Sequence, residues 1–234
     1  MPRPPRTDQG FLRAPLTAVF RSAGAVRVLR ALARHGGLLA VPTLERAAGL
    51  TNAGAHRVLR ALVDTGVVRA EGQGRVTAYR LDPEHPLAPA IAALFAAEEA
   101  RADRVLAAVR AATAPHAPNA VWLFGSAARG EDTPGSDADV AVVFRVGTPD
   151  AALDAVRAAL RPTEDAERVT VSVIGLWPED VERLSAGDPA GPDPLWLTLE
   201  RDAVPLAGPP PARLRLSVRR RDASWRSRRR GTMP

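Results

Sequence analysis

The chain has 234 residues, of which 46% are apolar; this is enough for one or two hydrophobic cores and favours two small domains. It contains no cysteine, which excludes disulfides, a thiolate nucleophile and cysteine-based zinc sites. No apolar run has the length of a membrane span or a signal peptide, so we expect a cytoplasmic protein with no membrane partner. Residues 209–234 carry nine arginines and one aspartate, a local charge of +8, so the net charge of +6 leaves −2 for residues 1–208.

The N-terminal part of the chain has the element order of a winged helix. Residues 1–15 contain four prolines and predict a disordered lead-in, and apolar residues at helical spacing predict a helix over 24–34 that stops at Gly36-Gly37. A short helix over 42–48, a turn at Gly49-Leu50 and a second helix from a Thr51 N-cap to about Asp64 follow. Residues 67–71 and 75–81 then predict a hairpin.

This stretch, about residues 20–82, resembles bacterial winged helix-turn-helix regulators, and residues 44–51 and 59–62 carry the match. The resemblance implies that the second helix reads the major groove of DNA. The candidate DNA-binding residues are Thr51, Asn52, His56, Arg57 and Arg60 on that helix, with Gln73 and Arg75 on the wing. The alternatives are a solvated helix face and a winged helix that binds protein.

We expect a winged-helix domain over residues 16–85, a linker helix over 86–112 that joins or dimerises the domains, a second domain over 113–208 and a basic disordered tail over 209–234. The tail either contacts nucleic-acid phosphates nonspecifically or serves as a solubilising end. In the second domain, strands over 120–124, 137–144 and 168–174 alternate with helices over 126–130, 149–160, 178–185 and 194–201. This order predicts an α+β fold with a mixed sheet.

The second domain holds the most informative motif. After the apolar run 121–124, Gly125-Ser126 opens a helix, whose free N–H groups favour phosphate, and Asp137-Ala138-Asp139 follows. Alternate residues of a strand face the same way, so Asp137 and Asp139 can converge on one hard cation. Arg129 either pairs with phosphate or forms a salt bridge to a nearby carboxylate.

Gly125, Ser126, Asp137 and Asp139 resemble the signature of the DNA polymerase beta nucleotidyltransferase superfamily, above all its minimal branch, and the likeness extends over about residues 119–208. The resemblance implies that Asp137 and Asp139 are catalytic ligands of Mg²⁺ or Mn²⁺, and that Gly125 and Ser126 bind the triphosphate of a nucleotide substrate. It also implies a third carboxylate on a later strand.

The sequence departs from the family at that third carboxylate. The strand over 168–174 carries Thr170 and Ser172 on its polar face, where the family has an acid. Glu164, Asp165 and Glu167 lie nearby in sequence, and substitution by one of them is left open.

The two resemblances imply two possible functions. The first is a DNA-binding protein whose nucleotidyltransferase domain binds Mg-NTP and transfers a nucleoside monophosphate to an acceptor, a protein acceptor included. The second is a catalytically weak or inactive transcriptional regulator or antitoxin that senses nucleotide or a toxin partner. A protein-binding winged helix with a decaying enzyme domain ranks last. Homodimerisation through residues 86–112 would suit a palindromic operator.

Overall fold

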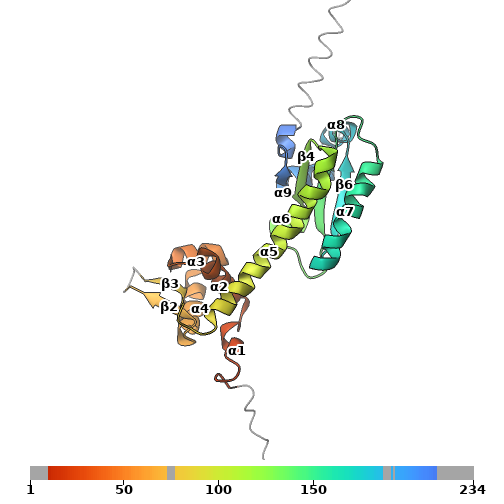
Figure 1. Ribbon diagram of the computed structural model, residues 1–234. Helices are drawn as coiled ribbons and strands as arrows, with labels where there is room; N and C mark the ends of the chain where they lie inside the picture. Colours follow the sequence, from red (N-terminus) through yellow and green to blue (C-terminus); the bar gives the residue numbers. More distant parts are fainter. Residues whose placement is uncertain (1–9, 73–76, 187–190, 192, 215–234) are drawn as a thin grey trace, which may run out of the picture. The chain divides into compact units, whose positions relative to one another are not determined.

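The computed structural model describes residues 10–72, 77–186, 191 and 193–214 (Figure 1). The chain divides into two compact units, Met1–Ala100 and Arg101–Pro234. None of the helices in the described ranges combines the length and the apolar character needed to cross a membrane.

The first unit is a winged helix, as the sequence predicts. Its helices are α1 (Leu16–Val19), α2 (Ala23–His35), α3 (Val41–Ala48) and α4 (Asn52–Asp64), and its strands are β1 (Leu39–Ala40), β2 (Val68–Glu71) and β3 (Ala78–Leu81). The three strands form an antiparallel sheet in the order β1-β3-β2.

Local signals fix the helix ends in this unit. The Ser22 side chain accepts a hydrogen bond from the Ala25 N–H, and Gly36 ends α2 in the left-handed conformation at φ 69°. Between α3 and α4 the turn begins at Gly49, with φ 58°, and the Thr51 hydroxyl caps α4 by accepting from the Gly54 N–H. The predicted N-cap at Thr51 is therefore confirmed.

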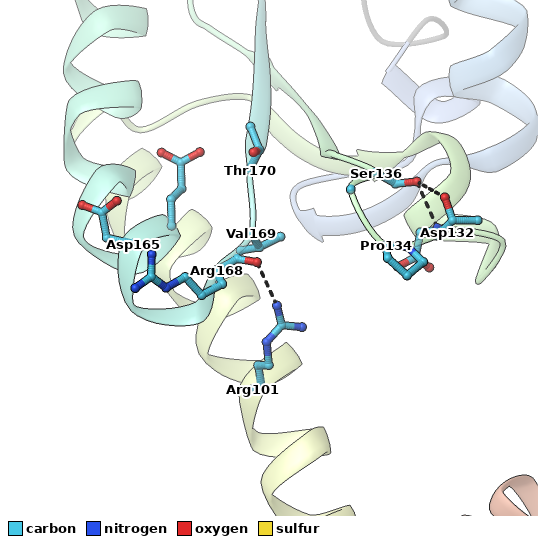
Figure 2. A pocket seen from close by; sticks show the side chains of 11 residues that line it. Arg101, Asp132, Pro134, Ser136, Asp165, Arg168, Val169 and Thr170 are labelled. Atoms are coloured by element: carbon cyan, nitrogen blue, oxygen red, sulfur yellow. Dashed lines mark hydrogen bonds between the residues drawn. The ribbon is translucent and has the colours of Figure 1, made fainter.

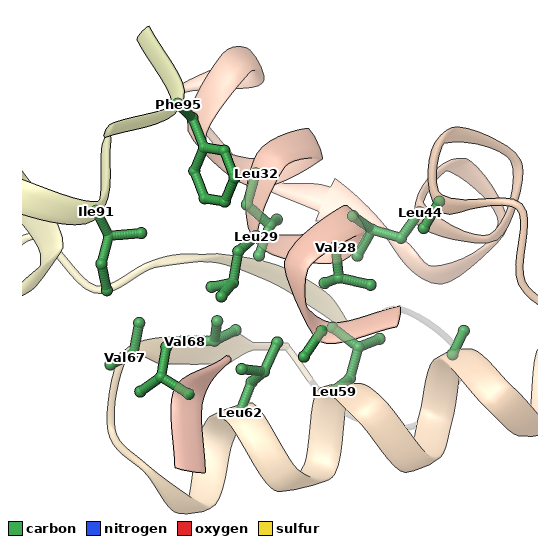
Figure 3. Close-up of a cluster of buried hydrophobic side chains, with 14 of the residues drawn as sticks. Val28, Leu29, Leu32, Leu44, Leu59, Leu62, Val67, Val68, Ile91 and Phe95 are labelled. Atoms are coloured by element: carbon green, nitrogen blue, oxygen red, sulfur yellow. The ribbon is translucent and has the colours of Figure 1, made fainter. Parts of the chain in front are cut away.

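The core of the first unit includes part of the expected linker helix. Leu59 and Leu62 of α4 pack with Leu29 and Leu32 of α2, as Figure 3 shows, and α5 (Ala88–Thr113) contributes further apolar side chains, among them Phe95. The boundary between the units falls within α5, whose later residues belong to the core of the second unit. The linker helix expected over 86–112 is thus the continuous helix Ala88–Thr113, and each of its ends is a core element of its own unit.

The second unit has the predicted mixed α+β architecture. Its elements are the 3-10 turn Ala114–His116, β4 (Ala120–Phe124), α6 (Gly125–Arg129), β5 (Ala138–Val143), α7 (Ala151–Glu167), β6 (Val171–Leu176), α8 (Pro178–Ala186), α9 (Pro194–Asp202) and β7 (Val204–Ala207). The strands lie in the order β6-β5-β4-β7, with β5 and β6 parallel and the other pairs antiparallel.

The sheet separates two apolar clusters. Val140 and Val142 of β5 pack with α5 and α7, on the side that we call the α7 face. Ala141 and Val143 pack with α8 and α9, on the side that we call the α9 face. Because side chains alternate along a strand, every odd-numbered residue of β5 belongs to the α9 face.

The short elements α1, β1 and the 3-10 turn were not expected, and the second unit differs from the expected elements at three further places. Helix α7 continues to Glu167 with Pro162 inside it, so β6 begins at Val171 and not at Arg168. Strand β7 was not expected; it contains Pro205 and lies at the sheet edge, where a missing N–H is tolerated. Leu214, placed in the tail by the sequence, is buried in the α9-face cluster.

Candidate functional site

The candidate metal and nucleotide site lies where β4 passes into α6, beside β5. Phe124, the last residue of β4, pairs with Asp139 of β5, so the next residue, Gly125, comes against the Asp139 side chain. A Cβ atom on Gly125 would lie 2.5 Å from Asp139 Oδ2, and Gly125 has φ 72°. Glycine is therefore favoured at this position for two reasons, the left-handed backbone conformation and the close approach of a carboxylate.

The two predicted aspartates lie at the start of β5. Asp137 immediately precedes β5 and is exposed, and Asp139 is half-buried within β5. Asp139 has the odd phase of Ala141 and so belongs to the α9 face, as does the Gly125 contact, and the two-residue period of an extended chain predicts the same face for Asp137. Two carboxylates on one face form an oxygen donor set suited to a hard divalent cation.

The N-terminus of α6 has free capacity for an anion. Within the described part of the chain, no side chain caps this helix, and its N-cap residue Phe124 offers only backbone. The first N–H groups of a helix have no partner within the helix, so those after Gly125 can donate outward. Ser126 is half-buried in this first turn and adds a hydroxyl donor. These groups fit phosphate oxygens.

In the part of the chain that the structure describes, no third carboxylate joins the two aspartates. The parallel register of β5 and β6 places Ser172 directly beside Asp139. Among the described residues, no three histidine, cysteine or acidic side chains gather as a metal-binding group.

Glu164 and Glu167, near the end of α7, are engaged on the other side of the sheet. Helix α7 packs on the α7 face, opposite to Asp139. Glu164 Oε1 accepts a hydrogen bond from the Val171 N–H at 2.7 Å, and Glu167 is bound by Arg104. Their roles here are to hold the α7–β6 connection and to tie α7 to α5.

Arg129 is bound by two carboxylates. Its guanidinium lies 2.5 Å from Asp202 Oδ2 and 2.7 Å from Glu131 Oε2. Hydrogen bonds from Arg201 and then Arg129 lower the pKa of the Asp202 carboxyl to about 2, although its side chain is only 2% exposed. The salt-bridge alternative for Arg129 is thus present, and a phosphate contact by Arg129 stays a prediction. Asp202 was missed by sequence reasoning because it lies 73 residues from Arg129 and outside any motif.

In the first unit, the candidate DNA-binding residues lie on the exposed side of α4. His56, Arg57 and Arg60 are exposed, whereas Leu59 on the opposite side is fully buried. Thr51 is committed to capping the helix, and the Asn52 side-chain amide donates to Glu45 Oε1 at 2.5 Å. Gln73 and Arg75 of the predicted wing tip lie outside the described residues.

Comparisons with known proteins agree with this division of the chain. Residues 108–184 match the family model of the nucleotidyltransferase domain, and residues 25–72 match that of the IclR helix-turn-helix domain. One similar solved structure is the homodimeric winged helix-turn-helix DNA-binding domain of a possible ArsR-family transcriptional regulator from Mycobacterium bovis. It is 25% identical, covers 44% of this chain and 91% of that chain, and superposes with a TM-score of 0.31. No curated protein matches the chain. The chain therefore joins a helix-turn-helix DNA-binding domain of the IclR type to a nucleotidyltransferase domain.

Proposed function

We propose that the second unit binds a magnesium-nucleoside triphosphate and transfers its nucleoside monophosphate to an acceptor hydroxyl, while the winged helix binds DNA. One observation carries the proposal: the Gly125 backbone lies against the Asp139 carboxylate, at the junction of β4 with the uncapped helix α6. A metal-binding carboxylate beside free N–H groups is the arrangement that a metal-bound triphosphate needs.

The residues divide the work of binding. Asp137 and Asp139 would hold Mg²⁺ or Mn²⁺, since both are oxygen donors that the strand period assigns to the α9 face, and Asp139 is held in place by its packing on Gly125. Ser126 and the first N–H groups of α6 would donate to phosphate oxygens. Arg129 lies at the end of the same helix, where a bound phosphate would compete with Asp202 and Glu131 for the guanidinium.

In the proposed reaction the acceptor oxygen attacks the α-phosphorus and pyrophosphate leaves. A divalent cation at this site supplies neutralisation of the charge that develops on the phosphate oxygens. The chain contributes orientation, because Asp139 and the α6 N-terminus are fixed relative to each other by adjacent backbone.

The transfer assay uses the full chain, α-labelled nucleoside triphosphates, Mg²⁺ and a panel of hydroxyl acceptors. We expect label in a product and release of pyrophosphate, both lost in Asp137→Asn/Asp139→Asn. The double variant Asp103→Asn/Glu182→Gln removes two exposed carboxylates elsewhere in the same unit and serves as the matched control. Transfer by the Asp137/Asp139 variant at the wild-type rate would show that these two residues do not belong to the catalytic site.

A second function is favoured by Ser172: a transcriptional regulator or antitoxin in which the domain senses nucleotide, or binds a toxin partner, without transfer. The register places this neutral hydroxyl directly beside Asp139, on the strand for which the resemblance implies a third carboxylate. A two-metal clamp on attacking and leaving oxygens loses an anionic ligand there, while nucleotide binding through Asp137, Asp139 and α6 keeps its groups.

Ser172→Asp separates the two functions, with Ser172→Asn as the neutral control of similar size. If the domain is a transferase whose rate is limited by the missing carboxylate, Ser172→Asp raises the transfer rate and the affinity for Mg²⁺ relative to the wild type and to Ser172→Asn. If the domain is a sensor, Mg-dependent nucleotide binding is measurable in the wild type, and no acceptor is modified by any of the three proteins.

The proposed partners follow from the domains. DNA would contact Arg57 and Arg60 of α4, and the arginines of residues 215–234, which lie outside the described residues, would add phosphate contacts. A homodimer would present two recognition helices to a palindromic operator. Size-exclusion chromatography with light scattering, with and without operator DNA, tests this assembly.

A further inference from the structure

A cleft of about 850 Å³ opens next to the candidate site, within the second unit (Figure 2). The loop before β5, including Asp132 and Ser136, forms one wall, and the end of α7 with Glu164 and Asp165 forms the other. We call this the α7 cleft. From the sequence, Glu164 and Asp165 are candidates only for replacing the third carboxylate, and none of the lining residues is assigned to an acceptor site.

The α7 cleft reaches the start of the two strands that carry the candidate site. Ser136, in its wall, immediately precedes Asp137. Thr170, also in its wall, accepts a hydrogen bond at its carbonyl oxygen from the Ala138 N–H at 2.9 Å. A molecule in the cleft would therefore lie beside the backbone that positions Asp137, at the end of the sheet that carries the proposed metal site.

Three carboxylates and two guanidinium groups leave the lining of the cleft with a net charge of −1. Its carboxylates belong to Asp132, Glu164 and Asp165, and its guanidinium groups to Arg101 and Arg168. Arg101 already donates to the carbonyl oxygen of Glu167, at 3.0 Å from Nε and 2.6 Å from Nη2. The C-terminal end of α7 forms this wall, and the negative end of a helix dipole also attracts cations. The phosphates of a bound nucleotide would add further negative charge.

The chain itself contains a segment with the complementary chemistry. Residues 215–234 carry eight of the nine arginines of the tail together with Ser217, Ser224, Ser227 and Thr232. Ser227 has an arginine on both sides, Arg226 and Arg228. Building on the proposed transfer, we propose that the α7 cleft is the acceptor site, that it takes an arginine-flanked serine, and that Ser227 of this chain is a substrate.

The length of the tail sets how far Ser227 can lie from the second unit. It leaves the described structure at Leu214, whose side chain is buried in the second unit, and Ser227 lies 13 residues further on. An extended chain of that length spans up to about 45 Å. The radius of gyration of a compact unit of this size is about 14 Å. The extended segment is thus about three times as long as this radius of gyration, a length compatible with contact to the cleft of its own chain or of a second copy.

The proposed step needs no reactant other than the nucleoside triphosphate and the serine. Ser227 Oγ attacks the α-phosphorus, the new Oγ–P bond forms, and the bond from the α-phosphorus to the α,β-bridging oxygen breaks. Pyrophosphate carries away the bonding electron pair, and the hydroxyl proton passes to solvent. The product is a phosphodiester between Ser227 and the nucleoside.

The test incubates the full chain with α-labelled forms of the four ribonucleoside triphosphates and Mg²⁺, with no added acceptor. Digestion before aspartate and mass spectrometry then locate the added mass. We expect it on the peptide that begins at Asp222, and on Ser227 within it, with loss of the signal in Ser227→Ala. We also expect labelling to fall as salt increases, because the attraction is electrostatic.

A cleft variant separates this inference from the proposed function. At nucleoside triphosphate concentrations below saturation, Asp132→Asn/Asp165→Asn should lower the rate of self-labelling at least about tenfold. The affinity for Mg-NTP, measured by calorimetry, should stay unchanged. Asp103→Asn/Glu182→Gln again controls for the lost charge. Mg-NTP binding without tail labelling, or labelling that ignores the cleft variant, overturns the acceptor assignment and leaves the nucleotide site standing. Absence of Mg-NTP binding contradicts the proposed function as well.

Discussion

At the scale of single residues, Gly125 is the most constrained position of the candidate site. It combines a left-handed backbone with the close approach of Asp139 Oδ2, so a side chain would strain the turn and displace the carboxylate together. Gly130, at the other end of α6, has φ 67° with no atom within 4 Å of an added Cβ. The two glycines therefore separate backbone strain from the contact with Asp139.

We expect Gly130→Ala to cost about 1–2 kcal/mol of unfolding free energy, the left-handed penalty, and to leave Mg-NTP binding intact. Gly125→Ala should cost more than that and abolish the binding. Urea denaturation and calorimetry on the same preparations check both. Equal effects of the two variants on nucleotide binding would show that the approach of Asp139 to Gly125 has no functional role.

The Asp202 carboxyl leads to a prediction about how the stability of the fold depends on pH. Its folded-state pKa of about 2 lies below the ordinary value of 3.8, because Arg201 and Arg129 stabilise the ionised form. The folded state therefore holds this proton less tightly than the unfolded state, so the stabilisation is full above about pH 5 and is lost as pH falls toward 2. Asp202→Asn should lower the melting temperature at pH 7, and the difference from wild type should shrink between pH 4 and pH 2.

Asp103→Asn, at an exposed position in the same unit, controls for the loss of a carboxylate. Melting curves followed by circular dichroism from pH 7 to pH 2 provide the measurement. A difference between Asp202→Asn and wild type that does not change with pH would mean that the ion pairs of Asp202 do not stabilise the fold.

At the scale of elements, helices α2 and α4 and the strands β4 and β5 are predicted well, because local signals and side-chain periodicity define them. The Thr51 hydroxyl caps α4 through the N–H of Gly54, only three residues later in the sequence. The buried run before Gly125 is a strand over the expected residues. Strand β7 is not recognisable locally, since its four residues include Pro205 and its partner is Trp122, more than 80 residues earlier.

Within the candidate site, too, local features are predicted from the sequence and features that depend on tertiary packing are not. The shared face of Asp137 and Asp139 follows from the two-residue period of a strand. The pairing of Arg129 with Asp202 and the α7 cleft depend on how α6 meets α9 and how α7 ends, which are properties of tertiary packing. The helix expected over 149–160 ends too early: α7 continues past Pro162 to Glu167, and it buries Leu160 in the core.

Helix α4 carries the prediction for DNA. Arg57 and Arg60 are exposed on one side of it, so replacing both with alanine should weaken DNA binding and reduce the slope of log affinity against log salt by roughly 2, about 0.9 for each lost phosphate contact. Fluorescence anisotropy with a labelled duplex at several salt concentrations measures this. Arg145→Ala, at an exposed position in the second unit, should leave both affinity and slope unchanged. Wild-type affinity in the α4 variant would show that this helix does not contact DNA.

At the scale of the whole molecule, the chain consists of two units with separate cores. Leu59 belongs to the core of the first and Leu160 to that of the second, and both are buried. Replacing either with alanine should cost its own unit about 2–5 kcal/mol. The three described tryptophans, Trp122, Trp177 and Trp196, all lie in the second unit and so report on it alone.

Urea unfolding followed by tryptophan fluorescence should therefore shift to lower urea in Leu160→Ala, and much less in Leu59→Ala. Circular dichroism, which reports helices of both units, should detect both variants. Leu59→Ala should weaken DNA binding and leave Mg-NTP binding unchanged. Loss of nucleotide binding in Leu59→Ala would show that the units do not fold independently.

The central claim is that the second unit carries a divalent-metal and nucleotide site built from Gly125, Ser126, Asp137 and Asp139. Isothermal titration calorimetry of the full chain with each nucleoside triphosphate, with and without Mg²⁺, tests it most directly. We predict saturable binding that requires Mg²⁺, is lost in Asp137→Asn/Asp139→Asn and is kept in Asp103→Asn/Glu182→Gln. Binding that is independent of Mg²⁺ and unaffected by the Asp137/Asp139 variant, or no binding of any of the nucleotides, would contradict the claim.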